Sequence, residues 1–325
     1  MMALMIYGAT GYMGRMAAEY AVAQGLEVVI AGRDHDKLRV LAAGLDVPYR
    51  VFTPDGLSAE LLDGVDVLVN FAGPFAHTAD ALMRGCIKVG VDYLDITAEI
   101  NVYRLAERLG TEAAKSGVML LPGVGWDVVP TDCLAVHVAR RVRNPQSLSI
   151  ALQVAGSMSR GSARSVSEII DAGLLARIDG QLVATPDAQA RHFDFGDGPT
   201  LCTPLSFGDL VTGWHSTGIP NISMFVHFSG DALPEGDLAQ RPEGRNAQER
   251  EVHRARAVAE VTGSDGQVAR SVIETVNGYT YTPIAAVEAA RQVLNGERRP
   301  GFETPAKLLG FGFAERIAGT TILDS

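Results

Sequence analysis

The chain has 325 residues, a formal net charge of −10 and 47% hydrophobic residues. This length predicts two domains with ample apolar cores. The acidic balance excludes the broad basic surface that nucleic acid or an anionic membrane would need. Cys86, Cys133 and Cys202 lack CxxC or Cys/His metal spacing, so we expect no metal site and favour a reducing, cytoplasmic location. No apolar run approaches the roughly 18 residues of a membrane span.

Up to Leu121, short apolar runs alternate with longer amphipathic runs, which is typical of a parallel sheet covered by helices. The predicted strands are 3–7, 27–31, 49–52, 65–70, 93–96 and 118–121. The predicted helices are 12–24, 34–43, 78–89 and 100–115. Six strands in this order predict a complete doubly wound Rossmann domain of the α/β class.

After Pro122 the pattern changes to that of a second, mixed α/β domain built on an open sheet. Its predicted elements are a helix at 130–141, a half-buried antiparallel strand at 147–154, a helix at 163–177, a strand at 222–228 and a hairpin around 263–266. The charged stretch 230–256 is interpreted as partly a mobile connection.

We therefore predict a Rossmann domain at 1–143, completed by a C-terminal segment at 283–325 that includes a helix at 284–294. The segment 144–282 is predicted to form a substrate and dimerisation domain. An open sheet leaves faces and edges that a second copy can cover, so a homo-oligomer, in the simplest case a homodimer, is expected.

The first predicted strand runs into the loop Gly8-Ala9-Thr10-Gly11-Tyr12-Met13-Gly14 and then a helix. This strand, turn and helix are the setting that a dinucleotide-binding fingerprint requires. Gly8 permits the tight turn, Gly11 the close approach of a pyrophosphate, and Gly14 the packing of helix on sheet. A glycine turn made for packing alone is the alternative.

The second strand ends in Ala31-Gly32-Arg33-Asp34, where an NAD enzyme presents an acid to the ribose 2′-hydroxyl. The guanidinium of Arg33 can bind a 2′-phosphate with two hydrogen bonds, which favours NADP(H) over NAD(H). Asp34 is interpreted as the cap of the next helix.

Three further motifs follow later strands: Asn70-Phe71-Ala72-Gly73-Pro74-Phe75, Tyr93-Leu94-Asp95-Ile96-Thr97-Ala98-Glu99, and Pro122 to Asp132. With the glycine loop, they resemble the saccharopine dehydrogenase (saccharopine reductase)-like family, in its bacterial branch of unassigned substrate. The resemblance covers the first 130 or so residues. Tyr279 to Thr282 and Gly301 to Ala306 are similar to the tail of that branch.

The resemblance implies an NADP-dependent oxidoreductase with the nicotinamide near Ala72, Gly73 and Pro74 and the substrate between the domains. Saccharopine itself is not implied as the substrate. Ala98 replaces the usual glycine and Trp126 the commoner phenylalanine, so the surroundings of the nicotinamide differ in shape.

The sequence offers candidate catalytic residues without deciding among them. Asp127 can relay a proton or bind a substrate amine, or it can cap the helix near Pro130. His77 can be an acid or a surface or capping residue. Arg160 and Ser162 can hold a substrate carboxylate, or serve as a plain helix cap with its counter-charge.

These patterns predict hydride transfer between NADP(H) and a small carbonyl, imine or enoyl substrate. No tyrosine is followed four residues later by lysine, which disfavours a short-chain dehydrogenase mechanism. One alternative is an NADP(H)-binding redox-sensing regulator without turnover. Another is an acylating semialdehyde dehydrogenase that uses the Cys133 thiolate as its nucleophile. Cys133 can instead be a buried residue of the core.

Overall fold

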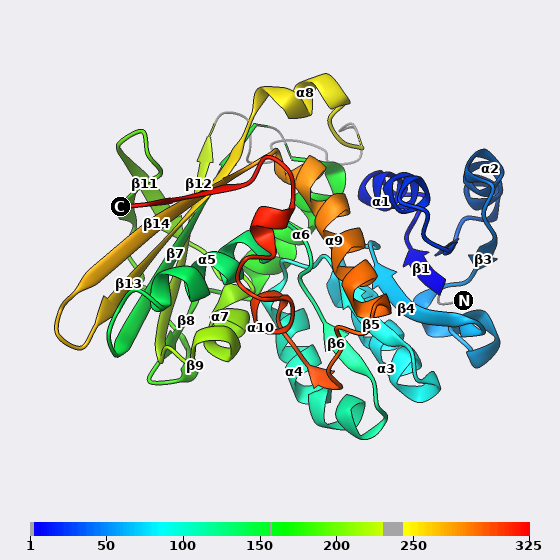
Figure 1. The fold of residues 1–325 in the computed structure, drawn as a ribbon, viewed down its shortest axis with the longest axis horizontal. Helices are drawn as coiled ribbons and strands as arrows, with labels where there is room; N and C mark the ends of the chain where they lie inside the picture. The colour runs from blue at the N-terminus through cyan, green and yellow to red at the C-terminus, as the bar shows by residue number, and fades with distance from the viewer. Residues whose placement is uncertain (1–2, 157, 230–242) are drawn as a thin grey trace. The chain divides into compact units, whose positions relative to one another are not determined.

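Seven parallel strands form sheet A in the computed structural model, which describes residues 3–156, 158–229 and 243–325 (Figure 1). Their order across the sheet is β15-β6-β5-β4-β1-β2-β3. The strands are β1 (Ala3–Tyr7), β2 (Val28–Gly32), β3 (Tyr49–Val51), β4 (Val65–Asn70), β5 (Asp92–Asp95), β6 (Met119–Leu121) and β15 (Gly301–Phe302). Without β15 this is the Rossmann order 3-2-1-4-5-6, so the predicted fold class is confirmed.

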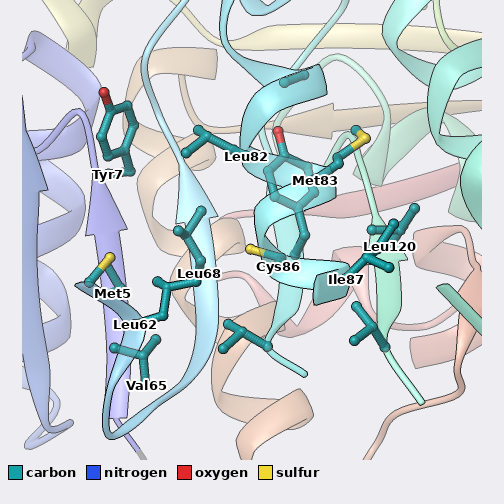
Figure 2. Close-up of a cluster of buried hydrophobic side chains, with 14 of the residues drawn as sticks. Met5, Tyr7, Leu62, Val65, Leu68, Leu82, Met83, Cys86, Ile87 and Leu120 are labelled. Carbon is teal, nitrogen blue, oxygen red and sulfur yellow. The ribbon is translucent and has the colours of Figure 1, made fainter. Parts of the chain in front are cut away.

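Helices on both faces bury sheet A. They are α1 (Tyr12–Ala23), α2 (His35–Leu45), α3 (Ala79–Val89), α4 (Ile100–Lys115) and α9 (Gly278–Leu294), with 3-10 turns at Pro54–Gly56, Ala59–Leu62 and Phe75–His77. Figure 2 shows Met5, Leu68 and Leu120 of the strands packed with Leu82 and Cys86 of α3. Leu4 and Ile6 point to the opposite face and are equally buried, as strand alternation requires.

The segment after residue 281 returns to sheet A. The amide of Gly301 donates to the Val118 carbonyl, and β15 extends the sheet beyond β6. The Arg298 guanidinium binds both oxygens of the buried Asp92 carboxylate, at 2.6 and 2.8 Å. A side chain at Gly110 would press on Phe302, so a glycine in α4 permits this docking.

Sheet B is mixed, in the order β10-β11-β12-β7-β13-β14-β16, with β8 paired to β12 and β9. Its strands are β7 (Pro145–Ala155), β8 (Leu175–Ile178), β9 (Gln181–Ala184), β10 (Arg191–Asp194), β11 (Pro199–Pro204), β12 (Asn221–Ser229), β13 (Ala255–Gly263), β14 (Val268–Thr275) and β16 (Thr321–Asp324). The helices with it are α5 (Val129–Ala139), α6 (Arg160–Asp171), α7 (Asp209–Thr217), α8 (Ala247–Val252) and α10 (Pro305–Leu309), with a 3-10 turn at Ala314–Arg316. The predicted second mixed domain and its hairpin at β13 and β14 are confirmed.

Two element predictions in this region were wrong. β7 is not a half-buried antiparallel strand: it pairs in parallel with β12 and antiparallel with β13, and consecutive residues such as Ala151 and Leu152 are buried. The helix predicted at 163–177 ends at Asp171, because Gly173 adopts a φ of +75° and the chain enters β8. Of the predicted mobile connection, residues 230–242 lie outside the described residues, and the remainder contains α8 and the start of β13.

The chain divides into two compact units. Unit 1 comprises residues 1–97, 101–125 and 282–303, and unit 2 comprises 98–100, 126–281 and 304–325. The division falls at 125 rather than at the expected 143, since α5 packs on β13 and β14 of unit 2. Only 282–303 of the expected C-terminal return joins unit 1, because β16 pairs with β14. In the described part of the chain, no helix has the length and hydropathy needed to cross a membrane.

Candidate functional site

The glycine loop after β1 is closed by backbone contacts that exclude side chains. Gly8 has a φ of +81°, and the Gly11 amide donates to its carbonyl at 3.0 Å. A Cβ at Gly14 would collide with the Gly8 carbonyl oxygen, so the first turn of α1 can lie on the loop only with glycine there.

The start of α1 suits a bound phosphate. Its N-cap is Gly11, which has no side chain to satisfy the first amides, and no acidic residue lies in the first turn. Thr10, Tyr12 and Met13 are partly buried around the exposed Gly11, and Ala9 is buried beneath the loop. Amides at an uncapped helix start, together with the helix dipole, bind anionic oxygens.

At the end of β2, Arg33 is exposed while Gly32 is buried beside the Gly8 amide. Asp34 accepts a hydrogen bond from the Lys37 amide at 3.1 Å and is the N-cap of α2, which confirms its predicted capping role. The Lys37 ammonium lies 3.7 Å from the Asp34 carboxylate. Asp34 is therefore engaged by its own helix, and Arg33 offers its charge to solvent or ligand.

The turn after β4 lies against the glycine loop. The Phe71 amide donates to the Tyr7 carbonyl at 2.8 Å, and a Cβ at Gly8 would lie 2.8 Å from the Ala72 amide nitrogen. The exposed Gly73 and the part-buried Pro74 follow. Two of the predicted cofactor segments thus meet at the carboxyl edge of sheet A, where ligands bind in open α/β sheets.

Asn70 stabilises this turn through hydrogen bonds of its side chain. It is fully buried, its Oδ1 accepts the Ala72 amide at 2.9 Å, and its Nδ2 donates to the hydroxyls of Thr78 and Tyr93. His77 ends the 3-10 turn that follows and its side chain is exposed. The imidazole of His77 therefore has no enclosed environment that would single it out as an acid.

Trp126 and Asp127 belong to unit 2. The Trp126 indole nitrogen donates to Thr275 Oγ1 at 2.9 Å, and its ring packs on Gly278. Asp127 is partly buried, and burial raises its pKa to about 6 against an opposing backbone hydrogen bond. The N-cap of α5 is Val128 and has no side-chain cap, so the alternative in which Asp127 caps this helix was wrong.

Two further carboxyl groups lie close to Asp127 in unit 2. Asp132 and Asp209 are fully buried, and burial raises the pKa of both. The charges of Asp132 and, more weakly, Asp127 raise the pKa of Asp209 further. Thr131 Oγ1 lies 2.9 Å from Asp209 Oδ2, and the Ala306 amide donates to Asp132 at 2.8 Å. Asp132 thereby fastens the start of α10 to α5.

The predicted substrate residues Arg160 and Ser162 lie in the first turn of α6. Ser159 is the N-cap and accepts the Ser162 amide at 3.1 Å, so the cap is Ser159 and not one of the two predicted residues. Tyr279 joins the cap: its hydroxyl accepts the Ser159 amide at 2.7 Å and donates to Ser162 Oγ at 3.1 Å. Arg160 is partly exposed beside them.

Residues 4–121 match the family model of the saccharopine dehydrogenase NADP binding domain. The matched range contains the glycine loop, Arg33 and the Asn70 turn, and NADP(H) is the cofactor of this domain, as predicted.

Curated proteins match part of this chain. The chain is 28% identical over 149 residues to a trans-acting enoyl reductase of Mycobacterium leprae, covering 43% of this chain and 36% of that protein. It is 27% identical over 145 residues to a lipid droplet localized protein of Caenorhabditis elegans, covering 40% and 34%. The matched part thus spans about a third of these relatives.

The apo saccharopine dehydrogenase (L-Glu forming) of Saccharomyces cerevisiae has a TM-score of 0.67 to this chain. The alignment covers 100% of this chain and 99% of that one, at 13% identity. The two proteins share a fold.

In unit 2, the structure argues against a cysteine nucleophile and adds two residues. Cys133 is fully buried, and burial raises the pKa of its thiol, so the core interpretation is confirmed over the thiolate. Tyr279 and Glu99 were not predicted as site residues; the Glu99 carboxylate is buried and accepts the Ser165 hydroxyl at 2.7 Å. The Glu99 position was visible in the motif, but its partner on α6, 66 residues away, was not.

Proposed function

We propose that this chain is an NADP(H)-dependent oxidoreductase that transfers a hydride between NADP(H) and a small carbonyl, imine or enoyl substrate. The observation that carries the proposal is the NADP-binding domain whose glycine loop and Asn70 turn meet at one edge of sheet A. The names of the matched enoyl reductases make enoyl compounds the first substrates to test. When bound by the glycine loop, Arg33 and the Asn70 turn, NADP(H) would supply the hydride.

Deuteride transfer tests this function directly. NADPH labelled at C4 with deuterium, on each face in turn, is incubated with enoyl, carbonyl and imine substrates, and the products are weighed by mass spectrometry. A product one mass unit heavier with one of the two labels is the expected result. Tight NADPH binding without transfer to any substrate contradicts catalysis and leaves the redox-sensing regulator.

We further propose Asp127 as the group that delivers the accompanying proton. A part-buried carboxyl with a pKa of about 6 is protonated in a useful fraction near neutral pH. The rate of substrate reduction should therefore fall as the pH rises above about 6. Asp127→Asn should lower kcat/KM by about 100-fold or more and abolish this pH dependence.

His77 provides the comparison for Asp127. His77→Gln should retain most of the activity, because its side chain is exposed. If the His77 variant is inactive and the Asp127 variant active, His77 is the acid.

Arg160 and Ser162 are proposed to bind a substrate anion at the start of α6. Arg160→Ala should then raise KM more than it lowers kcat.

We propose that the protein is a homodimer through unit 2 and resides in the cytoplasm. Leu201 of β11 and Leu323 of β16, on outer strands of sheet B, are 51% and 57% exposed, which suits a self-association surface. All three cysteines are free thiols, which suits a reducing compartment. Sedimentation velocity tests the dimer: a species of the monomer mass, 34.5 kDa, at all concentrations contradicts it.

A further inference from the structure

One buried carboxylate joins the turns that follow β4, β5 and β6. Asp95, at the end of β5, accepts the amides of Thr97 and Gly123 on its Oδ1, each at 3.0 Å. Its Oδ2 accepts the hydroxyl of Tyr93 at 3.0 Å. Asp95 and Tyr93 are fully buried, so these hydrogen bonds are made without competition from solvent.

The network continues from Tyr93 to the turn after β4. Asn70 Nδ2 donates to the Tyr93 hydroxyl at 3.1 Å and to Thr78 Oγ1 at 3.0 Å. The Ala72 amide donates to Asn70 Oδ1 at 2.9 Å, and Thr78 Oγ1 donates to the Ala72 carbonyl at 2.8 Å. Both polar groups of the Ala72 backbone are therefore fixed by side chains.

The direction of each hydrogen bond follows from the number of protons. Burial raises the pKa of Tyr93 well above its ordinary value, so its phenol stays protonated. Its single proton goes to Asp95, which leaves the phenol oxygen as an acceptor for the Asn70 amide group. Asn70 must then present its carbonyl oxygen to Ala72, and its side chain has one orientation.

At Ala72, this network contacts Gly8 of the glycine loop. A Cβ at Gly8 would lie 2.8 Å from the Ala72 nitrogen and 3.0 Å from the Ala72 Cβ. Gly8 and Ala72 are therefore in close contact, and the network fixes where the Ala72–Pro74 turn lies beside Gly8. Asp34, next to Arg33, caps α2, and the start of α1 is held by hydrogen bonds within the loop, so neither depends on this network.

We propose that Asp95, through Tyr93 and Asn70 and together with Thr78, fixes the position of the Ala72–Pro74 turn against Gly8 and thereby orients the nicotinamide half of NADP(H). This inference rests on the proposed function in one respect, the placement of the nicotinamide beside that turn. The adenosine half, bound through Arg33 and α1, lies outside the network. Loss of the network should weaken binding of the whole dinucleotide and leave binding of its adenosine half unchanged.

The test uses Thr78→Val and Tyr93→Phe in the full chain. Isothermal titration calorimetry gives Kd for NADPH and for adenosine 2′,5′-bisphosphate, which lacks the nicotinamide half. We expect each variant to bind NADPH about tenfold more weakly, as for the loss of one buried hydrogen bond, and the bisphosphate within twofold of the wild type. Thr78→Ser keeps the hydroxyl and should restore wild-type NADPH binding.

Tyr20→Phe is the matched control, because it also removes a hydroxyl bonded to a carboxylate of unit 1, that of Glu288 at 3.2 Å. It should change neither affinity. Equal weakening of both ligands, or no change in NADPH binding, overturns the positioning role. If Tyr93→Phe does not fold by circular dichroism, Thr78→Val and Thr78→Ser decide. A wild-type chain that binds bisphosphate and NADPH equally well refutes the nicotinamide placement, and one that binds neither refutes the proposed function.

Discussion

At the scale of single residues, cofactor choice depends on Arg33. Its guanidinium is exposed at the end of β2, and the neighbouring acid, Asp34, is used as a helix cap. Arg33→Ala should weaken NADPH binding by roughly 10- to 100-fold, the value of a charge-assisted hydrogen bond, and leave NADH binding unchanged. Titration of NADPH fluorescence gives both affinities.

Arg39→Ala is the control, since Arg39 is an exposed arginine of α2, the helix that follows Arg33, and its loss changes the net charge equally. A general electrostatic effect would weaken NADPH binding in both variants. Equal loss in the two would remove Arg33 from the explanation of cofactor choice.

Residue types at strand ends were predictable where the motif itself is local. The glycine loop, Arg33 and Asn70 follow from spacing along a few residues, and the cap formed by Asp34 follows from helix chemistry. The partnership of Ser162 with Tyr279 spans 117 residues, and no local pattern encodes it. The motif tyrosine and aspartate of β5 were recognised, but their hydrogen bonds to Asn70 needed the register of β4 and β5.

At the scale of elements, the fit of α1 on the loop depends on Gly14. Gly14→Ala places a methyl group against the Gly8 carbonyl and should lower the free energy of unfolding by about 1–3 kcal/mol. NADPH binding should weaken as well, because the loop must shift. Urea denaturation and NADPH titration measure the two effects.

Gly44→Ala in α2 is the matched comparison. Gly44 is exposed, has no atom within 4 Å of an added Cβ, and lies in regular helix. The substitution should raise the free energy of unfolding by up to about 1 kcal/mol through helix propensity. A Gly14→Ala variant as stable as Gly44→Ala would contradict the close packing of α1 on the loop.

Elements of sheet A were predictable because each parallel strand and its helix repeat one pattern. Sheet B was less so. A strand buried on both faces, such as β7, has no clear alternation, and its parallel partner β12 lies more than 60 residues away. The short strands β9 to β11 carry mostly exposed residues, so the hydrophobic period gave no signal for them.

At the scale of the whole molecule, stability should decrease as the pH rises from 5 to 8. The pKa of Asp127 is about 6 in the folded chain against 3.8 ordinarily, so protonation favours folding. This contribution is complete below pH 4 and is lost as the pH rises through about 6. Asp132 and Asp209 act with the same sign, since burial raises the pKa of both.

The comparison with Asp127→Asn isolates one carboxyl. Because Asp127 is partly exposed, its ionisation should cost about 1–3 kcal/mol of folding free energy at pH 8. Urea unfolding from pH 5 to 8 should therefore give a shallower decline for the variant. Parallel curves for variant and wild type would contradict an elevated pKa at Asp127.

The strand β15 is added to the NADP-binding domain by residues that follow the whole of sheet B in the sequence. During synthesis, the six N-terminal strands leave the ribosome first. The edge of β6 stays unpaired until β15 is made, nearly 180 residues later. Domains generally fold as they emerge, and an open strand edge invites pairing with other chains. Expression of residues 4–121 alone should therefore yield an aggregation-prone fragment, and a soluble version needs 282–303 supplied by a linker.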